Sequence, residues 1–431
     1  MISKHLFVLL ACVFVVMIGL GITMPVLPFY VERLALEEGV SRSALVMHVG
    51  LLTGVYALGQ FVFAPVWGRL SDRTGRRPLI LIGIAGYVIA QILFGLATSL
   101  WLLYAARILG GILSSATLPV SSAYIADLTT HKERSRGMAW LGSAVSLGFV
   151  VGPALGGMLT RRDLHFRESY GHFMVDSFSV PFFAAALLGL LTLFAAIRWL
   201  PESLPAQPLK AASAQTPNDS RMLARALGPL VGLAFVGQFG LAIFEATFAL
   251  YAQAKFNYGP VEVGAVFVVC GLVMTVFQIG GVAFLAGRVR EIFQIAGGFV
   301  LMRVSIALLD MAHTTFAVMA LVALLAFGMS FISPKLAALI SERGGSRRVG
   351  AALGVQNAAN SLGQASGPLL GGALFIWQVD APYFLTGALL VTVGLFMTWS
   401  SMFRQRMPRS PDETSEPGDG NFDLKNLRSG I

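Results

Sequence analysis

Twelve apolar stretches of about twenty residues alternate with short polar connections along this chain. Because a helix needs about 20 apolar residues to cross the hydrocarbon of a bilayer, each stretch predicts a transmembrane helix. The first six are expected near residues 6–28, 45–67, 79–98, 101–124, 137–159 and 180–200. The second six are expected near residues 227–251, 261–285, 292–311, 314–333, 350–374 and 381–403. The pattern predicts an all-α membrane protein with twelve transmembrane helices in two six-helix bundles.

The polar segments divide the chain into four parts. Residues 201–226 are rich in Pro, Ala and Ser, which predicts a flexible cytoplasmic linker between an N-terminal bundle (1–200) and a C-terminal bundle (227–403). Residues 404–431 mix Pro, Gly, Asp and Arg with almost no apolar side chains, so we expect a disordered cytoplasmic tail.

An internal repeat relates the two halves. Residues 146–157 read SLGFVVGPALGG, and residues 361–372 read SLGQASGPLLGG, at an offset of 215 residues. Each copy falls in the fifth stretch of its half. Two parallel halves related by an axis along the membrane normal are expected to form a binding site at their interface, near the bilayer midplane.

The charges support this topology. Only 12% of residues are charged, against about 25% in an average soluble domain. The net charge of +9 is compatible with nucleic-acid binding, but the basic residues lie in short connections between apolar stretches. With the N-terminus inside, 23 of the 31 lysines and arginines fall on the cytoplasmic side, six outside and two within spans. We therefore expect cytoplasmic termini and no nucleic-acid partner.

Motifs for enzymes and ATP-driven pumps are missing from the sequence. It contains no Walker loop, no HExxH zinc motif and no nucleophile elbow. The six histidines are scattered without metal-ligand spacing, and both cysteines lie inside apolar stretches. We expect no enzyme activity, no cofactor and no bound metal.

The connection after the second stretch, residues 68–78, combines glycines with charged residues. We expect Gly68 and Gly75 to permit tight turns, and Asp72 to cap a helix or pair with an arginine. A simple positive-inside anchor is the alternative, but the glycine and aspartate positions favour a latch between helices. The latch residues are Gly68, Asp72, Arg73, Gly75, Arg76 and Arg77.

Small residues line the fifth stretch. They allow close helix contact and a local kink at the proline, so packing and gating are both expected here. These residues are Gly148, Gly152, Pro153, Gly156 and Gly157.

Two ionisable residues lie deep within spans. Arg107 in the fourth span costs about 2.5–3.5 kcal/mol to insert, so it should face the protein interior and have a function. Glu245 lies in the middle of the seventh span, with Gln238 seven residues earlier on the same helix face. Burial favours its protonated form and a nearby arginine favours its carboxylate, so we expect a proton or cation role. The alternative is a permanent structural ion pair with an arginine. Arg303, seven residues before Asp310 in the ninth span, is expected to be mainly structural.

The residue 68–78 connection resembles the signature between the second and third helices of the major facilitator superfamily. Residues 19–28 (GLGITMPVLP), 107–111 and 148–157 are similar to motifs of its twelve-helix drug:proton antiporters, although Gly110 replaces a frequent glutamine. The loop after span four, with Asp127 and Arg134, also resembles the family pattern. The C-terminal half matches more loosely.

The overall likeness is to tetracycline and multidrug exporters. The Gram-negative tetracycline exporters carry membrane acids at positions that match Val16, Ala90 and Met302, so those carboxylates are absent here. Glu245 is then the only acid well inside a span, and we predict it to be the coupling carboxylate.

The resemblance implies a transporter of the bacterial inner membrane that exports lipophilic drugs in exchange for protons by alternating access, and we expect it to be a monomer. Spans one, four, seven and ten should line a central cavity that contains Arg107 and Glu245. A transporter of a small metabolite, such as a sugar or an amino acid derivative, is the alternative, although the spans offer few hydrogen-bonding side chains for it. A non-transporting sensor or scaffold would need a sizeable soluble domain, which the sequence does not indicate.

Overall fold

The computed structural model describes residues 4–129, 131–160, 167–170, 173–203, 217–278, 291–344 and 349–392. The first half contains α1 (Lys4–Glu37), α2 (Arg42–Thr74), α3 (Arg76–Gly95), α4 (Leu100–Leu113), η1 (Ser114–Ala116), α5 (Thr117–Leu128), α6 (His131–Leu159) and α7 (Val180–Trp199). A small antiparallel hairpin of β1 (Arg167–Tyr170) and β2 (Phe173–Asp176) joins α6 to α7. The second half contains α8 (Pro217–Phe256), α9 (Pro260–Val276), α11 (Glu291–Leu308), η3 (Leu309–Met311), α12 (Thr315–Gly344), α13 (Val349–Trp377) and a final helix Ala381–Thr392.

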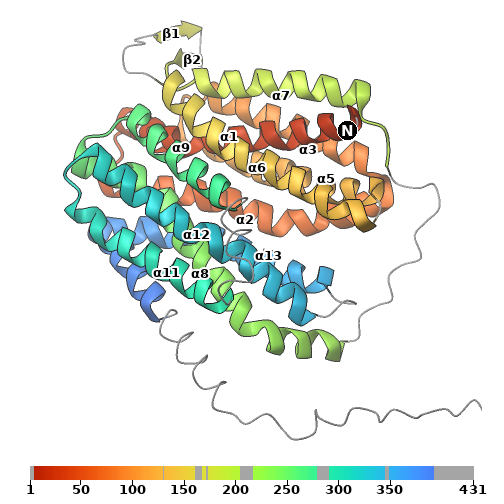
Figure 1. Ribbon diagram of the computed structural model, residues 1–431. Helices are drawn as coiled ribbons and strands as arrows, with labels where there is room; N and C mark the ends of the chain where they lie inside the picture. Colours follow the sequence, from red (N-terminus) through yellow and green to blue (C-terminus); the bar gives the residue numbers. More distant parts are fainter. Residues whose placement is uncertain are drawn as a thin grey trace, which may run out of the picture.

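Each of the twelve predicted spans contains a helix. Within the described residues, nine helices are long and apolar enough to cross a bilayer, and Pro260–Val276 and Ala381–Thr392 are shorter apolar helices. Together with α13 they make twelve transmembrane helices in two pseudo-symmetric six-helix bundles, as expected. Most of the red-to-yellow helices of the first half lie above the green-to-blue helices of the second (Figure 1).

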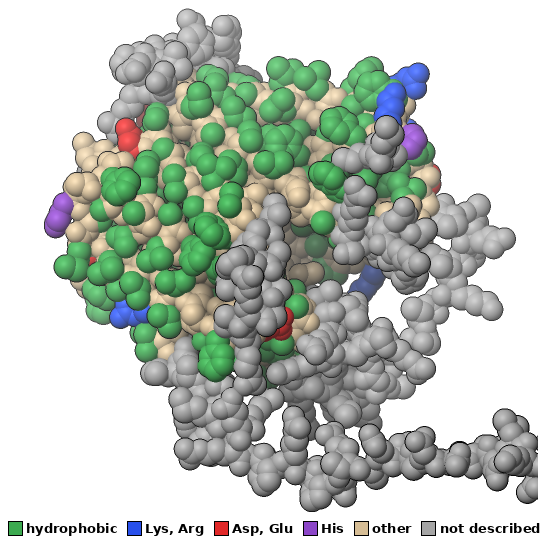
Figure 2. All heavy atoms as spheres, in the orientation of Figure 1, with side chains coloured by type: hydrophobic (Ala, Val, Ile, Leu, Met, Phe, Trp, Pro, Cys, Tyr) green, Lys and Arg blue, Asp and Glu red, His purple; other side chains and the backbone are tan. Residues whose placement is uncertain are grey.

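The outer surface is that of a protein surrounded by lipid. Large side chains such as Trp101 (83% exposed) and Phe316 (82% exposed) point outward. Hydrophobic side chains cover the middle of the visible face in Figure 2, and most of the charged ones lie toward its edges. Lipid tails are as apolar as leucine, so this exposure carries no hydrophobic penalty in a bilayer.

Three expected boundaries differ from the structure. Gly68 lies inside α2, which continues to Thr74, so the predicted turn at Gly68 is wrong and only Gly75 separates α2 from α3. The fourth span is broken by η1, where the Ser114 hydroxyl donates to the Gly110 carbonyl at 2.5 Å. The helix α8 begins at Pro217, so it overlaps the predicted linker over residues 217–226. The rest of that linker from residue 204, and the predicted tail, lie outside the described residues.

The repeated small-residue segments pack in the same way in both halves. On α6, Gly148, Gly152 and Gly156 face α1, and a Cβ added at Gly152 would lie 2.6 Å from the Ile18 carbonyl oxygen. Their repeat partners on α13 face α8 with similarly short distances, and these are Gly363, Gly367 and Gly371. The repeat is therefore one helix-packing surface used twice, α6 against α1 and α13 against α8.

Candidate functional site

A cavity of about 790 Å³ lies between the two halves. Its lining comes mainly from α2, α5, α6, α8, α9 and α13, and it includes Gly68, Ser122 and Gln278. Gly68 lies near the end of α2 and Ser122 near the end of α5, so the cavity extends toward the end of the protein at which Gly75 joins α2 to α3. We call this the Gly75 end.

At the opposite end, the two halves are in close contact. A Cβ added at Gly157 of α6 would lie 3.3 Å from the Gly264 Cα of α9, and one added at Gly50 of α2 would lie 3.5 Å from the Gly372 Cα of α13. Between α8 and α1, Gln253 Nε2 donates to Glu32 Oε2 at 2.6 Å. The cavity is therefore closed at the end that carries the β1–β2 hairpin.

The walls of the large cavity differ in polarity. The side chains from α6 and α9 include Phe149, Phe267 and Met274. Apart from Ala358, those from α13 are polar and recur three and four residues apart, which places them on one helix face. They are Asn357, Asn360, Ser361 and Gln364. The expectation that the spans offer few hydrogen-bonding side chains is therefore wrong for this cavity.

A smaller cavity of about 70 Å³ adjoins the large one. Both Arg107 of α4 and Glu245 of α8 line it, so the structure brings together these two predicted residues from opposite halves. Glu245 lines both cavities and lies where they meet. Gln238, predicted on the same helix face, lines the large cavity.

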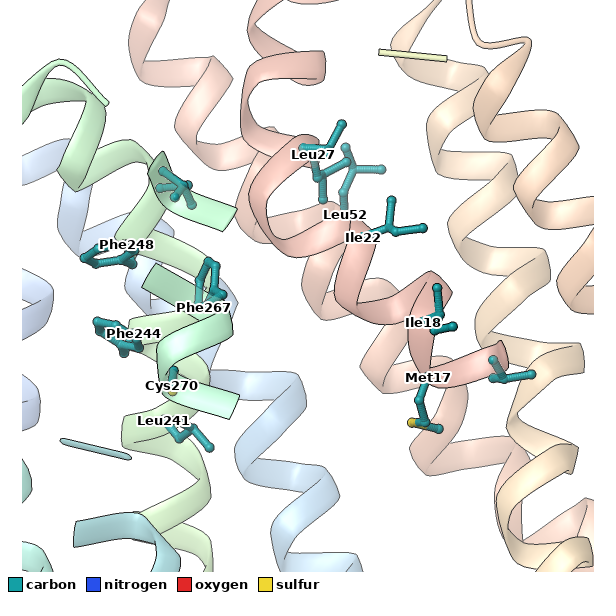
Figure 3. Packing of buried hydrophobic residues seen from close by; sticks show 14 of the residues in the cluster. Met17, Ile18, Ile22, Leu27, Leu52, Leu241, Phe244, Phe248, Phe267 and Cys270 are labelled. Atoms are coloured by element: carbon teal, nitrogen blue, oxygen red, sulfur yellow. The ribbon is translucent and has the colours of Figure 1, made fainter. Parts of the chain in front are cut away.

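The Glu245 carboxylate has no partner among the described residues. It is half-buried, and the structure shows neither a hydrogen bond nor an ion pair to it, including from Arg107. Phe267 and Cys270 of α9 line the large cavity together with Glu245. The Phe267 ring clusters with those of Phe244 and Phe248, as Figure 3 shows beside Cys270. A permanent structural ion pair between Glu245 and an arginine of the described chain is thus absent from this conformation.

Arg107 is 6% exposed, and its charge is stabilised by aromatic rings. The guanidinium carbon lies 5.1 Å from the Tyr56 ring centroid and 5.3 Å from that of Phe94. Such contacts contribute about 0.5–2 kcal/mol each. Its Nε is buried without a hydrogen-bond acceptor.

A third cavity, of about 20 Å³, lies on another side of Arg107. Val16, Ala90 and Gln91 line it, together with Arg107 itself. Two of the three positions that match the tetracycline-exporter acids therefore adjoin this arginine. Its described lining contains no carboxylate.

Arg303 lies apart from these cavities. Its side chain packs against Gly387 of the final helix, where an added Cβ would lie 3.2 Å from the arginine Cδ, and it lines none of the three cavities. Asp310 pairs with Lys255 rather than with Arg303. The Arg303 side chain of α11 thus packs within the second half, against the final helix, and is not part of the cavity predicted around Glu245.

The residues near Gly75 form an ionic network within the first half. Arg76 is buried and pairs with Asp72 at 2.6 Å and with Asp127 of α5 at 3.1 Å. Its guanidinium also donates to Ser71 Oγ at 2.5 Å, and Ser203 Oγ donates to Asp127 at 3.1 Å. The network ties α2, α3 and α5 to the segment that follows α7.

Gly75 permits this arrangement. Its φ of 101° is one that other residues rarely adopt, and a Cβ there would lie 2.5 Å from Glu202 Oε2. The Glu202 carboxylate accepts the backbone N–H groups of Arg76 at 2.8 Å and Arg77 at 3.1 Å, so it caps α3. Arg77 also donates to the Ile197 carbonyl at 2.8 Å, whereas Arg73 is exposed. The side chain of Arg134 lies outside the part that the structure describes.

The lining helices differ from those implied by the resemblance. Spans one, four and seven contribute to the two central cavities, but none of the described lining residues comes from α12, the tenth span. Instead α2, α6, α9 and α13 contribute most of the walls. The close α6–α9 and α2–α13 contacts between the halves bring these four helices to the interface.

Several residues of the site were not identified from the sequence. Tyr56 and Phe94 contact Arg107, and Glu202 caps α3, through contacts between segments that are distant along the chain. No local pattern marks these residues. The polar face of α13 was detectable, because its spacing is that of one helix side.

Comparison with known proteins agrees with this geometry. The model of the Major Facilitator Superfamily matches residues 9–344 and 230–429. Multidrug resistance protein 2 of Bacillus subtilis is 29% identical, over 92% of this chain and 96% of that protein. The quinolone resistance protein NorA of Staphylococcus aureus is 27% identical, over 89% of this chain and 93% of that protein.

A solved structure shares the fold. The bacterial homologue of the human lysosomal transporter Spinster, in an inward-facing and occupied conformation, superposes with a TM-score of 0.76 at 14% identity, covering 94% of this chain and 98% of that one. With the family model matching most of the chain and two six-helix bundles enclosing a shared cavity, this protein belongs to the Major Facilitator Superfamily of membrane transporters.

Proposed function

We propose that this protein is a proton-coupled secondary transporter that exports lipophilic solutes from the cell by alternating access. The names of its relatives support drug-like solutes, since they are multidrug and quinolone resistance proteins. The large cavity supports the same conclusion, because it is lined partly by aromatic and aliphatic side chains and opens at one end only.

The observation that carries the proposal is the position of Glu245. It is an acid without a described partner at the junction of the two central cavities, and Arg107 of the other half lines the smaller one. A proton and a cationic group of the solute cannot both neutralise one carboxylate, so they compete for it. Rearrangement of the halves changes the distance between Glu245 and Arg107, and proximity of the arginine favours release of the proton.

The available energy is sufficient for export. Moving one charge through 100 mV provides about 2.3 kcal/mol. Since each tenfold concentration ratio costs about 1.4 kcal/mol, one net charge per cycle sustains a gradient of roughly 50-fold.

Replacing Glu245 by glutamine tests this coupling. In liposomes with a pH gradient and a membrane potential of about 100 mV, the purified variant is expected to accumulate a lipophilic dye at least about tenfold less than the wild-type protein. Glu262→Gln is the matched control, because Glu262 lies outside the cavities at the start of α9, where its side chain accepts the Gly259 N–H and glutamine can do the same. Undiminished proton-driven transport by Glu245→Gln would remove this residue from the mechanism.

We further propose that the Gly75 end is cytoplasmic, as the distribution of basic residues favours. In a background without Cys12 and Cys270, Asn357→Cys in the large cavity should react with a membrane-impermeant maleimide in inside-out vesicles and remain unlabelled in intact cells. Met311→Cys, which is 69% exposed at the opposite end, should show the reverse pattern. Labelling of Asn357→Cys only in intact cells would mean that the orientation is inverted.

Transport of a polar metabolite is the second candidate. The polar face of α13 favours it, because a hydrophilic solute needs fixed hydrogen-bond partners. A competition assay distinguishes a drug-like solute from a polar metabolite. We expect micromolar lipophilic compounds to displace a bound lipophilic dye, and millimolar sugars or amino acids to leave it bound. Displacement by the sugars or amino acids would favour the polar metabolite.

A further inference from the structure

Arg107 carries hydrogen-bond donors that the described protein does not use. An arginine side chain has five N–H donors. Arg107 is 6% exposed, its Nε lacks an acceptor, and no ion pair or hydrogen bond to it is present among the described residues. A buried cation without an anion is costly, since the interior does not replace the hydration that the charge has lost.

The neighbouring rings stabilise the charge without using these donors. Tyr56 and Phe94 interact with the guanidinium through their faces, at 5.1 and 5.3 Å from its central carbon. The donors themselves lie in the guanidinium plane. Two parallel N–H groups in that plane match the two oxygens of a carboxylate, which is the pairing that arginine forms best.

There is room for such a group beside Arg107. The adjoining cavity has a volume of about 70 Å³, several times the roughly 10–15 Å³ that one water needs. It shares Met24, Gln60 and Glu245 with the 790 Å³ cavity, so a charged end of a solute can reach Arg107 while its body stays in the larger space. The 20 Å³ cavity near Gln91, whose Oε1 also lacks a partner, suits a single water.

We propose that Arg107 forms a subsite for the carboxylate of the transported solute. The solute class is then a lipophilic carboxylic acid, bound with its carboxylate in the 70 Å³ cavity and its apolar body against Phe149 and Phe267 in the large cavity. A cationic group on the same molecule would lie near Glu245, at the junction, so lipophilic zwitterions fit both charges. This inference rests on the proposed function, because it assumes that the solute enters this cavity.

Two dyes that differ only at the carboxylate test the subsite. Rhodamine 110 has a free carboxyl group, and rhodamine 123 is its methyl ester. We expect the full-length protein in lipid nanodiscs, without a proton gradient, to bind rhodamine 110 at least about tenfold more tightly in a fluorescence polarisation titration. Arg107→Gln should bind both dyes with the affinity of the ester, and Arg107→Lys, which keeps the charge but loses the planar fork, should retain a smaller preference.

Arg303→Gln is the matched control, since Arg303 is also an arginine within a span but lines none of the cavities. It should keep the full preference for the acid. The wild-type protein tests the subsite even if Arg107→Gln does not fold. Equal affinities of the wild-type protein for the acid and the ester, or no binding of either dye, would overturn the subsite. An unchanged preference for the acid in folded Arg107→Gln would also overturn it.

These titrations separate the subsite from the proposed function. Preference for the acid that depends on Arg107, combined with no proton-driven transport in liposomes, would support the subsite and contradict the proposed function. Proton-driven transport with no discrimination between the dyes would overturn the subsite alone.

Discussion

Alanine at Gly152 is expected to destabilise the protein by about 1–3 kcal/mol, the usual cost of overpacking a filled interface. The added Cβ would lie 2.6 Å from the Ile18 carbonyl oxygen and 2.7 Å from the Gly21 Cα, and both contacts are to the backbone of α1. Neither a rotamer change nor a flexible neighbour can relieve them, so α6 and α1 must separate. The measurement is the thermal unfolding midpoint in detergent, together with transport in liposomes.

The same helix provides the control. Gly142 also lies in α6, but nothing lies within 4 Å of a Cβ added there. Gly142→Ala should therefore be neutral or stabilising by up to about 1 kcal/mol, because alanine favours helix more than glycine does. Gly367→Ala at the repeat position of α13 should reproduce the loss, since its Cβ would lie 2.8 Å from the Ala242 Cβ and 3.0 Å from the Phe239 carbonyl oxygen. Equal midpoints for the Gly142 and Gly152 variants would contradict this packing.

Glutamine at Arg76 is expected to cost about 3–5 kcal/mol, as is typical when one partner of a buried ion pair is removed. The side chains of Arg76 and Asp127 are 7% and 13% exposed, so among the described residues the loss leaves the Asp127 charge with one hydroxyl donor, from Ser203. Asp72 contributes less, because its side chain is 62% exposed and is solvated by water. Urea or thermal unfolding in detergent measures the change.

A double variant separates charge burial from packing. Arg76→Gln with Asp127→Asn removes both buried charges and should recover part of the stability lost by Arg76→Gln alone. Arg73→Gln, at an exposed position three residues away, should change stability by less than about 0.5 kcal/mol. A double variant no more stable than the single one would show that Asp127 is not the group that Arg76 neutralises.

In this conformation the described contacts of the Gly75 network join helices of the first half to one another. Its described partners, Asp72, Asp127, Ser71 and Ser203, all belong to the first half. The described ionic contacts of the predicted latch residues thus lie within the first bundle, and their role as a latch stays a prediction. Among the described residues, the contacts between the halves include the glycine pairs and the Glu32–Gln253 hydrogen bond at the opposite end. Closing the cavity would require the second half to approach the first half at the Gly75 end.

The sequence predicted the number of helices and the duplication, because both depend on local properties. Apolar length decides whether a segment can cross a bilayer, and the segment from Ser146 and its copy from Ser361 identify the two halves. It also identified Arg107 and Glu245, since a charge within an apolar stretch must be accommodated by the protein.

Only the tertiary structure decided which faces of the helices meet. In a membrane the outside of a helix is as apolar as its packed side, so hydrophobic periodicity does not distinguish them. For this reason the place of Arg303 against Gly387, the rings of Tyr56 and Phe94 around Arg107, and the cap that Glu202 provides to α3 could not be predicted. Each joins segments distant along the chain, and the packing of the helices alone brings them together.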